Sequence, residues 1–324
     1  MPKSIQIDKP GPASAMKWRD VAVGKPKKGE VRLRQTAVGL NYIDVYHRMG
    51  LYPMPMPLTI GMEGAGVVEA LGAGVTGLKI GDRVAYAAPP LGAYAQERLM
   101  PAASVVKVPK AIDDQTAAAM MLQGMTVHYL LHSTYKVKKG DTILVHAAAG
   151  GIGLIMCQWA KHLGATVIGT VGGKKKADLA RAHGCDHVID YNKQNFVDRV
   201  KRITKGAGVP VVYDSVGKNT FYGSLDCLRP RGVMALFGNA SGPVTSIDPN
   251  ILAGKGSLFL TRPSLPNYVA TREELAKRSR DLFRVVAGGA VKIQVNQTYA
   301  LKDAAKAHRD LEARRTTGST VLIP

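Results

Sequence analysis

The chain changes its pattern of apolar and polar positions about one third of the way along. Before residue 110, short runs alternate apolar and polar side chains at 30–38, 66–71, 82–87 and 104–108, and Gly and Pro separate them. Alternation with a period of two residues predicts strands that bury one face. We therefore expect the first third to form a β-rich, barrel-like unit.

From Thr116 onward, the pattern predicts buried strands and helices that alternate. Residues 116–134 carry apolar side chains at helical spacing. Apolar runs of strand length then occur at 142–146, 166–171, 187–191, 209–215, 232–237 and 257–261, and helical patterns separate the first of them, at 152–163, 175–183 and 196–204. Such alternation predicts right-handed crossovers and a doubly wound parallel sheet.

The last fifty residues predict a return to the first unit. Residues 271–287 form a long amphipathic helical pattern, and 294–301 and 319–323 are typical of strands. We therefore predict an α/β protein with an inserted domain. A β-rich domain would comprise 1–124 with 289–324, and a nucleotide-binding domain would comprise 125–288.

Composition favours an ordinary globular protein. Of 324 residues, 46% are hydrophobic and 21% are charged, which suits about two domains. No apolar stretch reaches the ~18 residues of a membrane-spanning helix, and the first residues lack the apolar core of a signal peptide. Three scattered cysteines fit a reduced compartment. We expect no membrane association and a cytoplasmic location.

The formal net charge of +20 is the unusual feature of the composition. A basic surface attracts polyanions, so nucleic acid is one candidate partner. A basic proteome, or a site for a phosphorylated cofactor, is the simpler explanation of the charge. The basic residues are dispersed apart from Lys174–Lys176, and only 6% of residues are aromatic. Weak, sequence-independent and salt-dependent nucleic-acid binding is the most that we expect.

A glycine-rich turn carries the clearest chemistry. The expected strand at 142–146 is followed by AAAGGIG and then by an expected helix, so that Ala147, Gly150 and Gly153 give an A-x-x-G-x-x-G spacing with Gly151 between them. Glycines at such a turn let the backbone approach a pyrophosphate, whose charge is stabilised at the helix N-terminus. The strand–turn–helix context favours a dinucleotide site over a structural turn.

The end of the next strand indicates which dinucleotide binds. NAD sites usually place Asp or Glu there, ~20 residues beyond the glycines, on the ribose hydroxyls. Here the sequence is GTVGGKKKAD, with Gly172, Gly173 and then lysines. Glycine leaves room for a 2′-phosphate, and Lys176 is the best candidate for its charge partner. Tyr191 either flanks the same phosphate or the adenine, or is a tyrosine at a strand edge. We predict NADPH.

Several segments together resemble the medium-chain dehydrogenase/reductase superfamily, over essentially the whole chain. Within it, the sequence is similar to zinc-independent quinone oxidoreductases of the zeta-crystallin type. The segments that carry the resemblance are VGLNYIDVYHRMGLYP, GMEGAGVVEALGAGV, GDRVAY, LGAYAQE, HAAAGGIGLIMCQWAKHLGATVIGTVG, VVYDSVG, FGNASG, TRPSL and TREEL. The resemblance implies a GroES-like catalytic domain, a Rossmann domain, and a substrate cleft between the two.

Zinc alcohol dehydrogenases of the superfamily differ from this chain at their metal ligands. Their cysteine and histidine positions correspond to Asn41 and Met62, and the four-cysteine lobe is absent. Asparagine and methionine are poor zinc ligands. His128 and His132 are four residues apart but lack a third partner. We therefore expect no metal.

Without a Lewis acid, the substrate should need little activation. A quinone or an α,β-unsaturated carbonyl accepts a hydride to give an oxyanion that needs only hydrogen-bond donors. Asn41, Tyr46 and Tyr52 lie in the segment that lines the cleft of similar enzymes. We expect them to orient the substrate, Tyr52 first, although either tyrosine could simply pack. No essential acid or base is assigned.

The resemblance also implies further cofactor contacts and an oligomeric state. The expected contacts are Asn41, Tyr42, Ile43, Thr126, Tyr129, Ser215, Val216, Phe237, Gly238, Asn239, Ala240, Arg262, Pro263, Ser264 and Arg314. Family members pair through the nucleotide-binding domain. The apolar segment SLFLTR would be an exposed edge strand that needs cover, so a homodimer is expected.

The function predicted from these features is NADPH:quinone oxidoreductase activity. The nearest alternative is an NADPH-dependent reductase of enals, enones or enoyl thioesters, which shares the cofactor chemistry and differs in the shape of the cleft. A protein that also binds RNA is the alternative from a different class. It rests on the resemblance, since some zeta-crystallin relatives bind AU-rich RNA, and on the net charge of +20.

Overall fold

The computed structural model describes all 324 residues, which form two compact units. The first comprises Met1–Met125, Val269–Phe283 and Ile293–Pro324, and the second comprises Thr126–Tyr268 and Arg284–Lys292. Most of helix α9 (Arg272–Ala287) thus lies in the first unit, whereas the sequence pattern placed it in the second domain.

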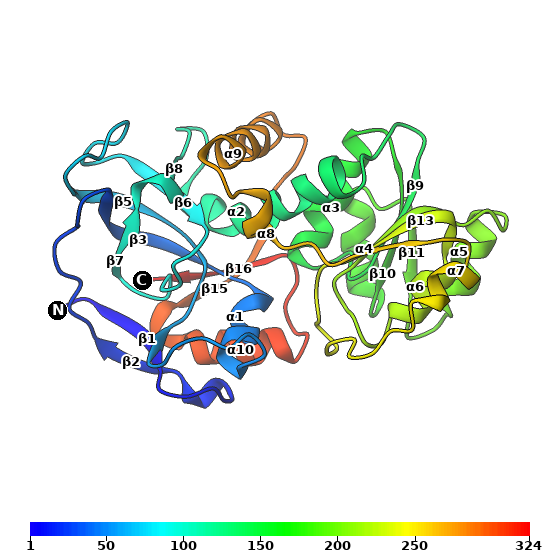
Figure 1. Ribbon diagram of the computed structural model, residues 1–324, viewed down its shortest axis with the longest axis horizontal. Helices are drawn as coiled ribbons and strands as arrows, with labels where there is room; N and C mark the ends of the chain where they lie inside the picture. The colour runs from blue at the N-terminus through cyan, green and yellow to red at the C-terminus, as the bar shows by residue number, and fades with distance from the viewer. The chain divides into compact units, whose positions relative to one another are not determined.

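Contacts made by α9 explain this correction. The Arg272 guanidinium donates to the backbone oxygens of Ala103, at 3.0 Å, and Val105, at 2.6 Å. Leu282 fills the space next to Gly124, where even a Cβ would collide with it. Figure 1 shows the helix beside β8 (Val106–Lys107). An amphipathic pattern reveals that a helix buries one face, but not which surface covers it.

A seven-stranded sheet dominates the first unit. Its order is β15-β16-β3-β5-β6-β8, and β7 also pairs with β3. The bounds are β15 (Val295–Ala300), β16 (Ser319–Ile323), β3 (Glu30–Leu40), β5 (Glu63–Leu71), β6 (Arg83–Ala87) and β7 (Glu97–Pro101). The two C-terminal strands therefore return to the sheet of the first unit, as their sequence pattern predicts. The expected strand at 104–108 is shorter, because residues 102–104 form a 3-10 turn.

A smaller sheet and three helices complete the unit. The sheet has the order β2-β1-β4, with β1 (Lys3–Ile7), β2 (Lys17–Asp20) and β4 (Leu58–Thr59). The helices are α1 (Tyr42–Met49), α10 (Ala304–Glu312) and, up to residue 125, α2 (Asp114–Tyr129), which a π-helical turn at Leu130–Thr134 follows. The apolar core joins side chains from both ends of the chain, such as Ile5, Leu33 and Leu322.

The second unit is a six-stranded parallel sheet of order β11-β10-β9-β12-β13-β14. Its strands are β9 (Thr142–Val145), β10 (Thr166–Val171), β11 (His187–Asp190), β12 (Val209–Asp214), β13 (Leu228–Leu236) and β14 (Phe259–Thr261). The central strands are rich in buried Val, Ile and Leu because both sheet faces are covered. The doubly wound parallel sheet predicted from the sequence is confirmed.

The helices of the second unit follow its strands in the expected alternation. Helices α3 (Gly151–His162) and α4 (Lys174–Ala182) pack together, and so do α5 (Phe196–Ile203) and α6 (Phe221–Asp226) (Figure 1). Helices α7 (Asn250–Gly254) and α8 (Leu265–Tyr268) are short. The strand order reverses between β9 and β12, and ligands bind at the carboxyl ends of strands at such a point. No helix is both long and apolar enough to cross a membrane.

Candidate functional site

The glycine turn lies at the carboxyl end of β9, next to the point where the strand order reverses. Ala147 adopts a left-handed φ of 53°, and the chain then enters α3 with Gly150 as its N-cap. At Gly153 a Cβ would collide with the Ala147 carbonyl oxygen and lie 2.7 Å from the Ala148 Cα. Glycine is therefore required at position 153, because helix and turn pack backbone to backbone.

The start of α3 is suited to bind an anion. The first N–H groups of a helix lack intrahelical acceptors and carry partial positive charge. No acidic residue lies in the first turn of α3. At Gly150 a Cβ would lie 3.3 Å from the Ala147 carbonyl oxygen, a tight approach that glycine avoids. These residues fit a dinucleotide pyrophosphate.

Four predicted residues lie at or beside the end of β10. Gly173 has a φ of 96°, and α4 begins directly after it with three lysines, of which Lys174 and Lys175 are exposed and Lys176 is half-buried. The Tyr191 ring lies against Gly172, where a Cβ would be 2.5 Å from the phenolic oxygen. The glycine thus makes room for the tyrosine, and both lie at the start of the lysine-rich helix.

Asp190 is a carboxylate that the sequence analysis did not place here. Its Oδ1 accepts the backbone N–H groups of Gly173 and Asn192, each at 3.1 Å. The residue belongs to the third strand of the alternation, so its distance in sequence hid its proximity to the end of β10. Because its Oδ1 accepts two backbone N–H groups, the carboxylate holds the turn at Gly173.

A buried carboxylate also shapes the loop after β12. Asp214 is fully buried, and its Oδ1 accepts the N–H groups of Val216, at 2.8 Å, and Gly217, at 3.0 Å. Its Oδ2 accepts the Ser224 hydroxyl at 2.9 Å, and the His146 imidazole contacts that hydroxyl at 2.9 Å. The predicted cofactor residue Val216 is therefore fixed by side chains inside the sheet.

Other predicted cofactor residues gather beside this loop. A Cβ at Gly238 would collide with the Ser215 carbonyl oxygen, and Ala240 donates its N–H to that oxygen at 3.2 Å. The Arg262 guanidinium, which follows β14, donates to the Leu236 backbone oxygen at 3.0 Å. The segments after β12, β13 and β14 thus meet at the carboxyl edge of the sheet. The predicted residues there also include Phe237, Asn239, Pro263 and Ser264.

Three tyrosines form an aromatic cluster in the first unit. The ring centroids of Tyr42 and Tyr46 are 5.4 Å apart, and those of Tyr46 and Tyr52 are 5.5 Å apart at an interplanar angle of 75°. Gly50, with a φ of 79°, ends α1 and lets Leu51 donate its N–H back to the Tyr46 oxygen. All three tyrosines are half-buried, so the predicted substrate-orienting residues Tyr46 and Tyr52 lie in contact.

Asn41 precedes this cluster and makes buried hydrogen bonds. Its Nδ2 donates to Glu63 Oε2 at 2.6 Å, and its Oδ1 accepts Gln123 Nε2 at 3.2 Å. Its backbone N–H donates to Asp44 Oδ2 at 2.9 Å. Burial raises the pKa of Glu63 to about 8 and that of Asp44 to about 7. None of these three neighbours was predicted from the sequence as a site residue.

A second buried network fixes α1 against α10. The Arg48 guanidinium, 1% exposed, donates to His308 Nδ1 at 3.0 Å and to both Glu312 oxygens at 2.8 and 2.9 Å. Arginine only donates, so Nε2 of His308 carries the proton and donates to the Tyr94 oxygen at 2.9 Å. The Tyr94 hydroxyl then donates to Asp44 at 3.1 Å. Burial lowers the pKa of His308 to about 3, so the imidazole is neutral.

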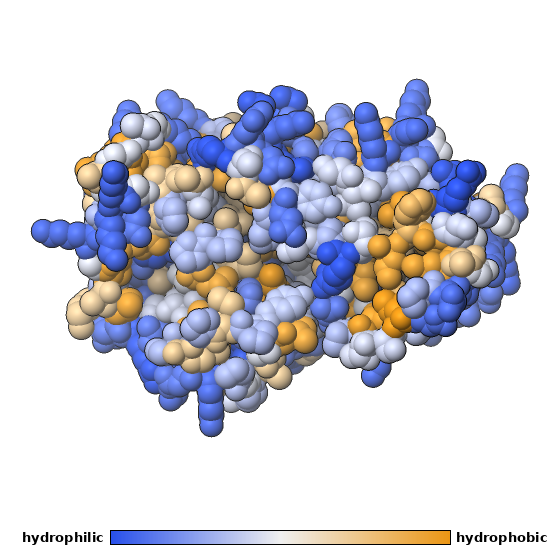
Figure 2. Space-filling model, in the orientation of Figure 1, coloured by the Kyte–Doolittle hydropathy of each residue, from blue (hydrophilic) through white to orange (hydrophobic).

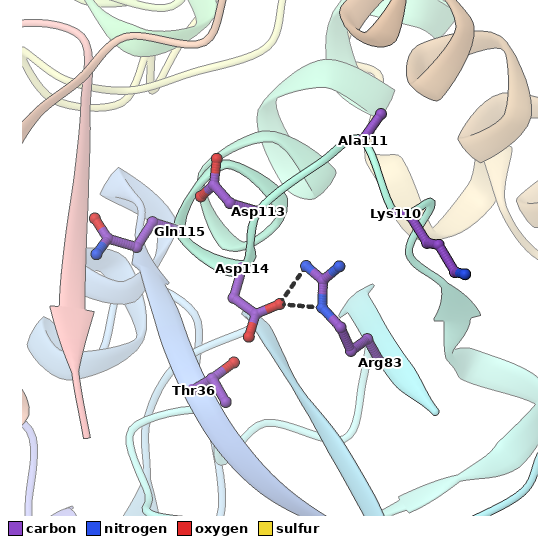
Figure 3. A pocket seen from close by; sticks show the side chains of 7 residues that line it. All are labelled: Thr36, Arg83, Lys110, Ala111, Asp113, Asp114 and Gln115. Atoms are coloured by element: carbon purple, nitrogen blue, oxygen red, sulfur yellow. Dashed lines mark hydrogen bonds and ion pairs between the residues drawn. The ribbon is translucent and has the colours of Figure 1, made fainter. Parts of the chain in front are cut away.

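A hollow of about 600 Å³ lies elsewhere in the first unit (Figure 3). It is lined by Thr36, Arg83, Lys110, Ala111, Asp113, Asp114 and Gln115. Figure 3 shows the Arg83 guanidinium directed at Asp114, with Nε 2.8 Å from Oδ1, so that these two charges neutralise each other. No predicted site residue lines this hollow, and we assign it no role.

Comparison with known proteins identifies the family. Residues 27–110 match the alcohol dehydrogenase GroES-like domain, and residues 151–271 match the zinc-binding dehydrogenase domain. A quinone oxidoreductase of Pseudomonas aeruginosa is 52% identical over the whole length of both chains. The chain belongs to the quinone oxidoreductase family. Its predicted membership of the medium-chain dehydrogenase/reductase superfamily is confirmed.

Two further relatives of this quinone oxidoreductase family member bear on its chemistry. The crystal structure of Escherichia coli quinone oxidoreductase complexed with NADPH has a TM-score of 0.98 and 48% identity, covering 99% of this chain and 100% of that one. A 2-haloacrylate reductase of Burkholderia is 50% identical over 98% of each chain. The predicted combination of a GroES-like domain and a Rossmann-type parallel sheet is confirmed by the family and structural matches.

Asn41 and Met62, which the family resemblance places at the zinc-ligand positions of related dehydrogenases, are both buried. No group of three or more His, Cys, Asp or Glu side chains is arranged to hold a metal ion. The imidazoles of His128 and His132 are 4.7 Å apart and both contact the Trp159 ring edge to face. In this quinone oxidoreductase family member, these two histidines therefore belong to an aromatic cluster.

The remaining predicted residues are dispersed in sequence. Thr126 and Tyr129 are buried on α2, and the Tyr129 ring stacks on Tyr268 with centroids 4.2 Å apart. Ile43 lies in the first turn of α1. Arg314 follows α10 with a left-handed φ of 58°. Their contact with the cofactor stays a prediction.

Proposed function

We propose that this protein transfers reducing equivalents from NADPH to small quinones. The observation that carries the proposal is a full-length similarity to quinone oxidoreductases combined with an intact dinucleotide turn in the second unit. The glycines at 150 and 153 and the acid-free first turn of α3 fit a pyrophosphate. We propose that the protein belongs to the zeta-crystallin-type subfamily, which fits these features best.

The second unit would hold the cofactor, which supplies a hydride when it is bound. The α3 N-terminus would stabilise the pyrophosphate charge, and Gly150 and Gly153 would permit its close approach. Lys176 would neutralise the 2′-phosphate, with Tyr191 beside it. Gly172 and Gly173 carry no side chain that would fill this space. Asp190 Oδ1 would hold the turn at Gly173 through two backbone N–H groups.

The first unit would orient the quinone. The rings of Tyr46 and Tyr52 offer an edge-to-face surface for a planar acceptor. The carboxamide of Asn41 offers an N–H group to the oxyanion that forms as the quinone is reduced. We propose that this chemistry needs no zinc, because asparagine and methionine replace the ligands of the zinc enzymes. No side chain is required as an essential acid or base.

Reduction of an activated alkene is the second candidate function. The similarity to a 2-haloacrylate reductase favours it, since that name describes an α,β-unsaturated acid as the substrate. In both reactions hydride transfer generates an oxyanion, which the same donors would stabilise until it takes a proton from solvent. The two reactions differ in the shape of the acceptor molecule that the first unit must bind.

One kinetic experiment separates these functions. The initial rates of NADPH and NADH oxidation are measured after treatment with a metal chelator, with 1,4-benzoquinone, a naphthoquinone and a simple enone as acceptors. Rapid loss of NADPH with quinones, and slow loss of NADH, is the expected result. Turnover of the enone alone would transfer the function to alkene reduction. Loss of activity after chelation would refute zinc-independence.

We also propose a homodimer that forms through the β14 edge. Phe259 on this strand is 61% exposed, and β14 is the last strand of its sheet. Figure 2 shows apolar residues gathered on the second unit, over the region where Figure 1 labels β13, β11 and α6. An edge strand with exposed apolar side chains is a template for pairing. Light scattering should give a dimer mass, and Phe259→Lys should give a monomer.

Location and nucleic-acid binding follow from less specific features. Cys157, Cys185 and Cys227 are buried free thiols, which fit a reducing compartment, and we place the protein in the cytoplasm. The net charge of +20 would attract nucleic acid weakly and without sequence preference. Retardation of RNA in a gel should disappear as salt is raised. Sequence-dependent binding that persists at high salt would contradict this expectation.

A further inference from the structure

A chain of four buried side chains runs from β5 to β16 through Asn41. Glu63 Oε2 accepts Asn41 Nδ2 at 2.6 Å, and Asn41 Oδ1 accepts Gln123 Nε2 at 3.2 Å. Gln123 Oε1 in turn accepts the Ser319 hydroxyl at 2.9 Å. Glu63 is fully buried, and the other three side chains are at most 6% exposed. Every hydrogen bond in this chain points toward Glu63.

The direction of the chain is imposed at the Glu63 end. An amide side chain can be turned by 180° with almost no change of shape, so its neighbours decide which end faces where. Glu63 accepts on both oxygens, since Oε1 receives the Leu122 N–H at 2.7 Å. When Glu63 is ionised, both of its oxygens can only accept, so the facing amide must present Nδ2. Gln123 must then donate its Nε2 to Asn41 Oδ1, and Ser319 must donate its hydroxyl to Gln123 Oε1.

The backbone around Glu63 is arranged to admit the carboxylate. Glu63 pairs with Gly39 in the sheet, and a Cβ at Gly39 would lie in the space of the carboxylate and of the Ala118 carbonyl oxygen. Leu122 lies within α2, so its N–H would ordinarily bond the oxygen of residue 118. The side chain of Glu63 therefore enters the hydrogen-bond ladder of α2, next to the helix position of Gln123.

We propose that Glu63 is a positioning residue, which fixes the direction of the Asn41 carboxamide so that an N–H, and not the carbonyl oxygen, faces the reacting acceptor. The proposal rests on the proposed function of Asn41 toward the quinone oxyanion. The carboxamide has two N–H groups, of which Glu63 takes one, and the same rotation places the other. A reversed carboxamide would present an oxygen to the developing negative charge.

The variant Glu63→Gln reverses the direction of the hydrogen bonds in this series, and the side chain keeps nearly the same size. Its amide can accept the Leu122 N–H only with the oxygen, so its Nε2 then faces Asn41. Asn41 must turn its Oδ1 toward that group, and Gln123 must turn in response. With 1,4-benzoquinone, we expect kcat to fall at least about tenfold, as for loss of an oxyanion donor. Glu69→Gln on the same strand, where the side chain pairs with exposed Arg34, is the matched control.

A double variant separates positioning from structural support. In Glu63→Gln with Asn41→Asp, the new carboxylate accepts from both the introduced amide at position 63 and Gln123, so every hydrogen bond of the chain is restored with no N–H in the side chain at position 41. We expect the melting temperature to return to that of the wild type while kcat stays low. Recovery of kcat in the double variant would refute the proposal, as would wild-type kcat in Glu63→Gln.

The titration of Glu63 gives an independent readout. The ionisable groups that face it are Asp44, Tyr86 and Tyr94, and burial together with Asp44 raises its pKa to about 8. The fraction of Glu63 that is ionised, and that therefore accepts on both oxygens, increases as pH rises through 8. We expect kcat of the wild type to rise in that range and kcat of Glu63→Gln to stay flat. The same rise in both proteins would count against the proposal.

The hydrogen-bond chain can also be observed without a quinone. In ¹H–¹⁵N spectra, the side-chain amide signals of Asn41 and Gln123 should shift in Glu63→Gln and not in Glu69→Gln. Unchanged signals would refute the reversal itself. If the wild type fails to reduce any quinone, the proposed function fails, whereas these spectra still decide whether Glu63 sets the direction of the amide.

Discussion

The two units build their candidate sites by different means. In the second unit, the site consists mainly of backbone: a left-handed turn, glycines packed against carbonyl oxygens, and a helix N-terminus. In the first unit, the site consists of side chains joined by buried hydrogen bonds from β5, α1, α2 and β16. The first kind of site is encoded by one continuous segment. The second kind depends on residues almost 280 positions apart, such as Asn41 and Ser319.

The largest expected effect tests the backbone site. Gly153→Ala places a Cβ against the Ala147 carbonyl and 2.7 Å from the Ala148 Cα, so the turn must deform. We expect NADPH affinity, measured by fluorescence titration, to fall about 100-fold, because binding sites fail when their geometry shifts by about 1 Å. Gly254→Ala is the control, since its Cβ would meet nothing within 4 Å. Equal affinities in both variants would show that the turn tolerates a side chain.

The next effect tests, through stability, the buried network that joins α1 and α10 in the first unit. Glu312→Ala removes the carboxylate that pairs with Arg48, a guanidinium that is 1% exposed. Removing one partner of a buried pair costs ~3–5 kcal/mol, and since Glu312 is 33% exposed we expect the lower end. Urea unfolding measures the loss. Glu273→Ala, which changes an exposed carboxylate on α9, should cost far less.

A smaller effect concerns cofactor selection. Lys176→Ala should raise the KM for NADPH about tenfold and leave the KM for NADH nearly unchanged, since one charge-assisted contact contributes ~1.4 kcal/mol. Lys175→Ala, which alters an exposed neighbour on the same helix, is the control. Parallel changes in both KM values would remove Lys176 from the phosphate site.

The smallest effect is the pH dependence of folding in the first unit. Burial raises the pKa of Asp44 to about 7 and of Glu63 to about 8, from ordinary values of 3.8 and 4.5. At a pH between the ordinary and the raised pKa of each carboxyl group, the native state holds a proton that the unfolded state has lost. The free energy of unfolding therefore falls as pH rises.

His308 opposes this trend at lower pH. Its pKa is lowered from 6.5 to about 3, so the unfolded state binds the extra proton there and stability rises with pH up to 6.5. The free energy of unfolding should therefore show a net decline between pH 6.5 and 8. Urea midpoints at pH 6.5 and 8.5 measure it, and Glu63→Gln should reduce the decline. A wild-type midpoint that rises over this interval would contradict the raised pKa values.

The fold was predictable where the pattern is long and regular. The strand expected at 166–171 coincides with β10, and the helix expected at 152–163 differs from α3 by one residue at each end. The strands β1, β2 and β4 were not predicted, because buried and exposed positions do not alternate regularly along them. Helix α1 was also missed, since its pattern continues directly from the preceding strand.

The sequence by itself determined the cofactor turn, because a strand, a glycine-rich turn and a helix are consecutive and each position has a local steric reason. It also determined which tyrosines and which asparagine are candidates for the acceptor. Only the tertiary structure decided that Glu63, Gln123 and Ser319 bind in series with that asparagine. The physical reason is that hydrogen bonds between buried side chains depend on sheet register and helix packing, which link residues that no local pattern connects.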